Sequence, residues 1–211
     1  MSSKKSRMDV TKKCKRYWHI LRYGVRWIFM ERLRGLDFSM RDSSTFVATG
    51  GMMYAYRATK PGHFLEILKG LDFNHERSFL DIGCGKGLVL KLAKEHPGFS
   101  KCGGVEYNRK TADICTRNMR RLGLDDVPVW VGDAREFADY ESYDTFYLFN
   151  PFGPEVFRDV IRKIPSHRTT VIYHNPTCHQ LVMDTGRFQL KKQLYDKFRD
   201  YYTNIYIGID E

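Results

Sequence analysis

Short runs of apolar residues alternate along most of the chain with segments in which apolar positions recur every three or four residues. The short runs are typical of buried strands, and the second pattern is typical of amphipathic helices. We expect strands at 78–82, 102–106, 127–131, 145–149 and 169–173. We expect helices at 63–71, 86–95, 108–122 and 154–164, and a short helix at 179–183. Strands separated by helices predict an α/β fold, a parallel sheet with helices on both faces.

The C-terminal part of the chain departs from this alternation. The segments 188–194 and 202–209 are both rich in residues that favour strands, and no helix lies between them. A parallel connection needs a crossover of a dozen residues or more, so these two segments predict an antiparallel hairpin. Together with the five earlier strands, the hairpin gives a mostly parallel seven-stranded sheet with an antiparallel edge.

The N-terminal segment differs from the rest of the chain in charge. The 211 residues carry a net charge of +10, and residues 1–35 alone hold eleven Lys or Arg against Asp9 and Glu31, a net +9. From 12 to 36 there is no proline, and apolar residues recur at helical spacing between the arginines. We therefore divide the chain into a basic, partly helical N-terminal extension, 1–45, and one α/β domain, 46–211.

Three interpretations of the basic segment 4–34 remain open. A helix that carries Trp18, Trp27 and Phe29 among basic residues can lie on an anionic membrane surface. The same basic side chains can instead contact the phosphates of a nucleic acid. In the third interpretation the apolar face caps the α/β domain and the charged face is only solvated.

Cysteine usage and hydropathy favour a cytoplasmic location. The five cysteines are odd in number and none are spaced C-x-x-C, and the basic start is not followed by the apolar stretch of a secretory signal. No run of about 18 apolar residues occurs, so no membrane span is predicted, although association at the membrane periphery remains open. The seven histidines show no metal-ligand spacing, so no metal site is predicted.

The sequence D-I-G-C-G-K-G at 81–87 follows an apolar strand and opens a helix. A glycine-rich turn at this place lets a ligand approach the backbone and meet the N–H groups of the helix start. The dinucleotide fingerprint G-x-G-x-x-G would require a glycine at 88, where this chain has Leu88. The D-x-G-x-G-x-G form instead resembles motif I of the class I methyltransferases that depend on S-adenosylmethionine (SAM). The structural alternative is a glycine turn that only packs a helix on the sheet.

Polar residues also end the following strands. Glu106 ends the second strand, where a carboxylate can accept hydrogen bonds from both ribose hydroxyls. The resemblance implies that Asp133 accepts from the adenine amine, that Ala134 contacts the ring, and that Asp81 holds the methionine end. The implied cofactor is SAM, and the implied cofactor-binding residues are Tyr56, Thr59, Asp81, Gly83, Cys84, Gly85, Gly87, Glu106, Tyr107, Asp133, Ala134 and Asn150. For Tyr56 and Thr59, an ordinary core or turn role is an equal alternative.

The fourth strand ends in Asn150-Pro151-Phe152, where the methyl acceptor of such an enzyme should lie. The motif resembles the N-P-P-[YF] of adenine-N6 and glutamine-amide methyltransferases without its second proline. It is also similar to the N-N-F of the seven-strand histone-lysine methyltransferases, with Pro151 in place of the second Asn. The side-chain carbonyl of Asn150 and the adjacent backbone carbonyl can accept hydrogen bonds from an amine or amide, and Phe152 can pack on a planar or apolar acceptor. The structural alternative is a strand-ending turn without a catalytic role.

The expected function is therefore the transfer of a methyl group from SAM to an acceptor at residues 150–152, with nitrogen favoured by analogy. The acceptor could be a protein lysine or other amine, a nucleic acid or a small molecule. Two alternatives from other classes remain: a non-catalytic SAM- or nucleotide-binding partner protein, and an NAD-dependent oxidoreductase, which Leu88 disfavours. His174, at the end of the fifth strand, is a candidate base or a structural histidine.

Overall fold

The computed structural model describes residues 33–38, 41–42, 56–73, 75–197 and 200–209. The chain divides into two compact units, Met1–Asp37 and Phe38–Glu211. Nearly all of the basic segment 4–34 lies outside the described residues, so its helical character, its partners and the domain boundary at 45/46 remain predictions. Within the described ranges, no helix is long and apolar enough to cross a membrane.

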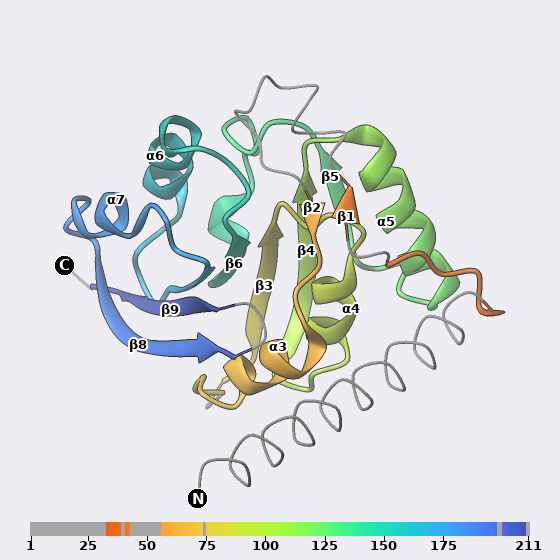
Figure 1. Ribbon diagram of the computed structural model, residues 1–211, viewed down its shortest axis with the longest axis horizontal. Helices are drawn as coiled ribbons and strands as arrows, with labels where there is room; N and C mark the ends of the chain where they lie inside the picture. The colour runs from red at the N-terminus through yellow and green to blue at the C-terminus, as the bar shows by residue number, and fades with distance from the viewer. Residues whose placement is uncertain (1–32, 39–40, 43–55, 74, 198–199, 210–211) are drawn as a thin grey trace, which may run out of the picture. The chain divides into compact units, whose positions relative to one another are not determined.

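A seven-stranded sheet forms the centre of the second unit (Figure 1), in the order β5-β4-β3-β6-β7-β9-β8. Its five parallel strands are β3 (Arg77–Ile82), β4 (Phe99–Glu106), β5 (Val129–Val131), β6 (Thr145–Phe149) and β7 (Thr170–His174). The last two strands, β8 (Phe188–Asp196) and β9 (Tyr201–Gly208), form an antiparallel hairpin, and β9 also pairs antiparallel with β7. The sequence-based prediction of the fold class is confirmed.

One pairing was not predicted. β1 (Arg41–Asp42) and β2 (Tyr56–Arg57) form a separate two-stranded antiparallel sheet. Each strand has only two residues, which is too short to leave a periodic hydrophobic signal in the sequence.

The helices lie close to their predicted positions. They are α3 (Pro61–Leu68), α4 (Leu88–Lys94), α5 (Arg109–Arg121), α6 (Pro154–Lys163) and α7 (His179–Met183), and a 3-10 turn, η1, spans Tyr140–Ser142. The side chain of Asn108 caps α5 by accepting a hydrogen bond from the Thr111 amide over 3.1 Å. α4 begins two residues later than predicted because Gly87 has a left-handed backbone, with φ at +86°.

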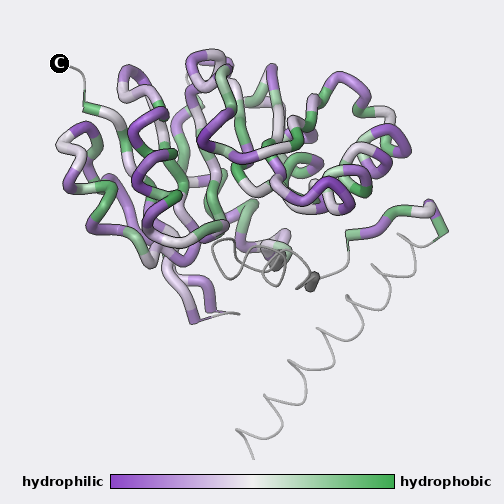
Figure 2. The backbone as a smooth tube through the Cα atoms, turned by 90° about the horizontal axis from the view of Figure 1, so that it is seen from above, coloured by the Kyte–Doolittle hydropathy of each residue, from purple (hydrophilic) through white to green (hydrophobic). Residues whose placement is uncertain are grey.

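Successive side chains of β3 and β6 point to opposite faces of the sheet. Phe79 and Tyr147 contact Phe64 of α3 edge to face, at ring distances of 6.0 and 5.4 Å. Leu80 and Phe146 point to the opposite face, where the main hydrophobic cluster also contains residues of α6 and α7. Figure 2 shows hydrophilic and hydrophobic residues alternating along the helices, as helices with one buried face require.

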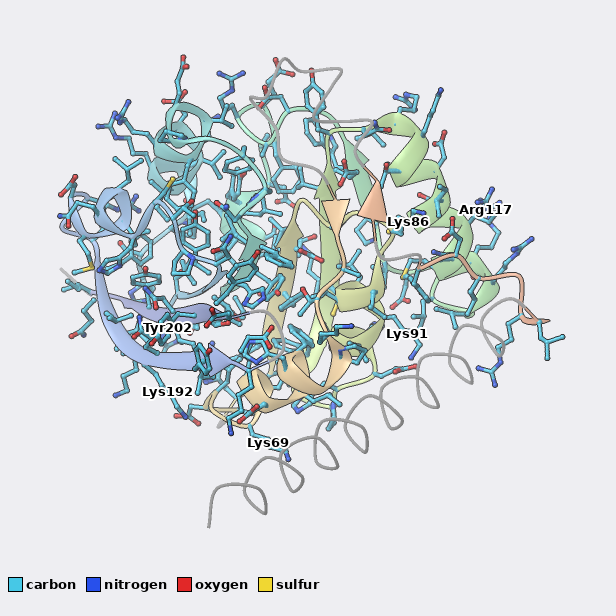
Figure 3. All side chains as sticks on the ribbon, viewed as in Figure 1. Lys69, Lys86, Lys91, Arg117, Lys192 and Tyr202 are labelled. Atoms are coloured by element: carbon cyan, nitrogen blue, oxygen red, sulfur yellow. The ribbon has the colours of Figure 1, made fainter. Side chains whose placement is uncertain are left out.

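The C-terminal hairpin is tied to α3 as well as to β7. His63 of α3 lies 2.8 Å from the Thr203 hydroxyl of β9. A Cβ built on Gly70, just after α3, would lie 3.0 Å from the Lys192 ammonium of β8. Figure 3 shows Lys192 and Tyr202 on the hairpin, with Lys69 on the nearby end of α3. The hairpin and α3 therefore meet beside the end of β7.

The strand order places the predicted site residues at one edge of the sheet. From β3 the chain proceeds outward through β4 and β5, and it then returns to add β6 on the other side of β3. In open α/β sheets, ligands bind at the carboxyl ends of the strands where the order reverses in this way. The loops after β3 and β6 are therefore neighbours, although they are far apart in the sequence.

Candidate functional site

Main-chain hydrogen bonds join the loops that follow β3, β4 and β5. The amides of Gly83 and Cys84 both donate to the Val105 carbonyl, over 2.8 and 3.0 Å. The Gly132 amide donates to the Glu106 carbonyl over 3.0 Å. Because these bonds use backbone groups, the relative positions of the three loops depend little on side-chain identity.

The side chain of Glu106 bonds to the loops that follow β3 and β4. Its carboxylate accepts hydrogen bonds from the Gly85 amide over 2.9 Å and from the Asn108 amide over 2.8 Å. Hydrogen bonds from amides to a carboxylate are stronger than neutral ones, so the two donors fix the orientation of this side chain. The bond to Gly85 also joins the glycine loop directly to the end of β4.

Asp81 lies beside Glu106 and is only 3% exposed. Burial raises the pKa of its carboxyl well above the usual value, and the negative charge of Glu106 raises it further. The pair therefore favours a proton on Asp81. A positively charged group bound between these carboxylates would oppose both causes and favour release of that proton.

Two glycines of the loop are required by the protein's own packing. A Cβ on Gly83 would lie 2.7 Å from the Cβ of Pro151, and a Cβ on Gly87 would lie 2.5 Å from the sulfur of Cys115. Both glycines, and Gly85 between them, also have positive φ values, of 81°, 86° and 57°. Gly83 therefore makes room for the loop after β6, and Gly87 makes room for α5.

Cys84, the remaining predicted residue of this loop, is buried. A hydrogen bond with the thiol of Cys115 raises its pKa, and burial and the nearby carboxylates of Asp81 and Glu106 raise it further. Cys84 therefore carries a neutral thiol rather than a reactive thiolate.

Asp133 follows β5 as expected, but its carboxylate is already engaged. It accepts hydrogen bonds from the guanidinium of Arg135, the shortest over 2.7 Å, and from the Arg135 amide over 2.9 Å. These bonds with Arg135 hold the pKa of Asp133 below its usual value. The next residue, Ala134, is buried, and its carbonyl accepts a hydrogen bond from the Tyr140 hydroxyl over 2.8 Å.

The other predicted cofactor contacts differ in their surroundings. Tyr107, directly after Glu106, is 45% exposed. The hydroxyl of Thr59 is instead buried against that of Tyr147, 2.7 Å away, which favours the core role weighed for Thr59. Tyr56 lies in β2, and its side chain is outside what the structure describes.

Asn150 directly follows β6 and has a left-handed backbone conformation, with φ at 39°. Asn tolerates this region better than most residues, and such a conformation is frequent at functional sites. Its side-chain oxygen accepts two hydrogen bonds, from the Tyr173 hydroxyl over 3.0 Å and from the Thr177 hydroxyl over 2.7 Å. The Tyr173 hydroxyl in turn accepts from the Cys178 amide over 3.3 Å.

The other two residues of the motif face the protein. Pro151 lies against Gly83, which joins the loop after β6 to the glycine loop. Phe152 is 3% exposed and belongs to the main hydrophobic cluster, with its ring 6.2 Å from that of Phe157. This position does not support the expectation that Phe152 packs on an acceptor, because its ring is already covered by the core.

Sequence reasoning missed the partners of Asn150. Tyr173 lies on the adjacent strand and Thr177 on the following loop, and neither belongs to a motif. It also missed a cluster in which His63, His174 and Asp196 come together. His174 is completely buried, which argues against its predicted alternative role as a base that contacts substrate.

Comparison with known proteins agrees with this arrangement. Residues 79–167 match the family model of a methyltransferase domain. The chain contains a class I SAM-dependent methyltransferase domain. The matched range includes the glycine loop, Glu106, Asp133 and Asn150, and it excludes Thr59 and the C-terminal hairpin. No curated protein matches the sequence.

Solved structures show that the methyltransferase fold extends beyond the matched range. A variant of MtNAS in complex with SAM is 20% identical, with a TM-score of 0.54, and the alignment covers 71% of this chain and 63% of that one. The ribosomal protein L11 methylase from Lactobacillus delbrueckii subsp. bulgaricus is 13% identical, with a TM-score of 0.58 and coverage of 83% and 84%. TrmN from Thermus thermophilus is 16% identical, with a TM-score of 0.57 and coverage of 72% and 49%. This chain thus spans less than two thirds of MtNAS and about half of TrmN.

Proposed function

We propose that this chain transfers the methyl group of SAM to a nitrogen of an acceptor held beside Asn150. The observation that carries this proposal is the direct packing of Pro151 on Gly83, which brings the end of β6 against the glycine loop of the methyltransferase domain. A group bound by the glycine loop and a group bound at Asn150 would therefore be neighbours, as direct transfer between two substrates requires.

In this proposal, the residues around β3 to β5 hold the cofactor. Glu106, whose orientation two backbone amides fix, accepts hydrogen bonds from the ribose hydroxyls. Asp81 stabilises the ammonium group of the methionine end, and this positive charge favours release of the proton from its carboxyl. Asp133 and Ala134 line the adenine, with Arg135 holding the Asp133 carboxylate in place.

The reaction needs little chemistry from the protein, because the sulfonium of SAM is already a good leaving group. The nitrogen lone pair attacks the methyl carbon, the new C–N bond forms as the C–S bond breaks, and the sulfur keeps the electron pair as a neutral thioether. The acceptor nitrogen then loses a proton to solvent. The role left to Asn150 is to align the nitrogen with the methyl group.

The hydrogen bonds of Asn150 refine that role. Its side-chain oxygen already accepts from two hydroxyls, which uses both lone pairs of an amide oxygen. We therefore assign the contact with the acceptor N–H to the main-chain carbonyl of Asn150. Tyr173 and Thr177 are positioning residues, because they hold the Asn150 side chain and act on the acceptor only through it. Phe152 supports the loop from the core.

Substitution of Asn150 tests the acceptor role. Asn150→Ala removes the side chain that Tyr173 and Thr177 hold, so the Asn150 carbonyl is no longer fixed, and kcat should fall by about 100-fold. The SAM dissociation constant should change by less than about threefold. Asn150→Gly is the matched control for backbone strain, since glycine keeps the left-handed conformation at no cost and removes only the side chain. Calorimetry gives the affinity, and transfer from labelled SAM gives kcat. Equal losses in affinity and turnover would contradict the acceptor role.

The acceptor class is tested by incubating the protein with labelled SAM and separated protein, nucleic acid, lipid and small-metabolite fractions of a lysate. Label should enter one fraction through a bond to nitrogen. SAM binding without transfer to any fraction would instead support the non-catalytic alternative. We also propose a reducing, cytoplasmic location, which the free thiols of the four described cysteines support.

A further inference from the structure

Three titratable residues from distant parts of the chain meet in the interior beside the end of β7. His63 comes from α3, His174 is the last residue of β7, and Asp196 is the last residue of β8. Potential ligand atoms, one from each residue, all lie within 4.8 Å of one another. The exposed fractions are 2% for His63 and 0% for the other two residues. The cluster is separate from the residues assigned to SAM and to the acceptor.

We propose that His63, His174 and Asp196 form a buried site for a divalent first-row transition metal, with zinc as the ion that fits best. Two imidazole nitrogens and one carboxylate oxygen are ligands that these ions accept, whereas magnesium and calcium prefer oxygen alone. The proposal rests on this cluster alone and does not depend on methyl transfer.

The distance between His174 and Asp196 supports a shared ion. The Nε2 atom of His174 lies 3.6 Å from an oxygen of Asp196, which is longer than a hydrogen bond. Two ligands bound to one tetrahedral zinc at ordinary bond lengths lie ~3.3 Å apart. The pair therefore has nearly the separation of two metal ligands and needs only a small contraction to bind.

Thr203 orients both imidazole rings. Its hydroxyl oxygen lies 2.8 Å from Nε2 of His63 and 2.7 Å from Nδ1 of His174. Metal-bound histidines commonly donate their second ring N–H to an oxygen, which fixes the tautomer. When His174 donates from Nδ1 to Thr203, its unprotonated nitrogen is Nε2, the atom that faces Asp196.

Aromatic rings lie against His174. The His174 ring lies 5.0 Å from that of His63 and 4.2 Å from that of Phe149. A divalent ion would also compensate the carboxylate of Asp196, which is costly to bury.

A metal ion bound here would rigidify the start of the loop that follows β7. His174 is followed directly by Asn175, whose backbone is left-handed with φ at 53°, and two residues later comes Thr177, which holds Asn150. The ion would join α3, β7 and β8 behind this loop. We infer a structural role, since a fully buried ion has no contact with the acceptor or with SAM.

Metal content of the purified full chain tests the proposal. Protein from cells grown with added zinc should carry about one equivalent of divalent metal per chain, measured by inductively coupled plasma mass spectrometry. Removing the ion with a chelator should lower the melting temperature, and Zn²⁺ or Co²⁺ should restore it. Wild-type protein that carries no stoichiometric metal, and whose melting temperature excess Zn²⁺ leaves unchanged, would overturn the proposal.

Variants distinguish a metal site from a cluster of buried polar side chains that binds no metal. Thr203→Val should weaken metal affinity by about 10- to 100-fold, because the rings lose the oxygen that orients them. Thr169→Val removes another buried hydroxyl, which donates to the His167 carbonyl, and should leave metal affinity unchanged. Asp196→Asn should abolish stoichiometric binding. Should Asp196→Asn fail to fold, the wild-type and threonine measurements still decide, and equal affinities in the two threonine variants would contradict the proposal.

Discussion

The proposed cofactor side and the proposed acceptor side of this methyltransferase domain are built from different kinds of contact. On the cofactor side, around the ends of β3, β4 and β5, main-chain amides donate to the Glu106 carboxylate and to neighbouring carbonyls. On the acceptor side, around the ends of β6 and β7, side chains bond to side chains, as Tyr173 and Thr177 do to Asn150. The bonds between backbone groups on the cofactor side are independent of which side chains are present, whereas the bonds to Glu106 and Asp133 there, like those to Asn150, are not.

We infer from this difference that the two sides differ in how readily a substitution can change what they bind. Loops joined by backbone hydrogen bonds can recognise one unchanging cofactor in chains of low identity. A side held by hydroxyl and amide side chains can change its acceptor with few substitutions, because each contact depends on a particular residue. The packing of Pro151 on Gly83 is the direct link between the two sides.

Breaking that link should have the largest effect. Gly83→Ala places a methyl group against Pro151 in a left-handed backbone, so it should disturb both sides and weaken SAM binding by about 100-fold, with a similar loss of turnover. Calorimetry and the transfer assay measure the two losses. Gly123→Ala is the matched control, because Gly123 also has a positive φ, of 70°, but a Cβ added there would meet nothing within 4 Å. Equal effects in the two variants would show that strain alone, and not the link, is responsible.

Removing one hydroxyl from each side should separate the two functions. Tyr173→Phe deletes a hydrogen bond to Asn150 and should lower kcat by about tenfold without changing SAM affinity. Tyr140→Phe deletes the hydrogen bond to the Ala134 carbonyl and should weaken SAM affinity instead, with kcat retained at saturating SAM. The same pattern of losses in both variants would remove the distinction between the sides.

The smallest expected effect is a shift in stability from Asp81. Because its pKa is raised from 3.8 in the folded protein, ionised Asp81 costs stability, and this cost grows as the pH rises above 3.8. Asp81→Asn removes the cost, so the SAM-free variant should melt a few degrees above wild type at neutral pH and bind SAM more weakly. Melting curves between about pH 4 and 8 should show the difference shrinking toward low pH. A constant difference would contradict the raised pKa.

The same contrast explains what the sequence could predict. The fold, the glycine loop and Glu106 were predictable, because they depend on hydrophobic periodicity and on short motifs at strand ends. The partners of Asn150 were not, since Tyr173 and Thr177 are 23 and 27 residues away and meet it only through the pairing of β6 with β7. The cluster of His63, His174 and Asp196 could not be predicted for the same reason, because 111 residues separate His63 from His174. The buried position of Phe152 also depends on packing that no local pattern reports.

The measurement that tests the central claim most directly is calorimetric titration of the purified chain with SAM in buffers of different ionisation enthalpy. Our account predicts saturable binding at one site, accompanied by proton release as the ammonium group of the methionine end favours ionised Asp81, and loss of that release in Asp81→Asn. The absence of any heat with SAM or with its demethylated product, together with binding of a nicotinamide dinucleotide, would contradict it.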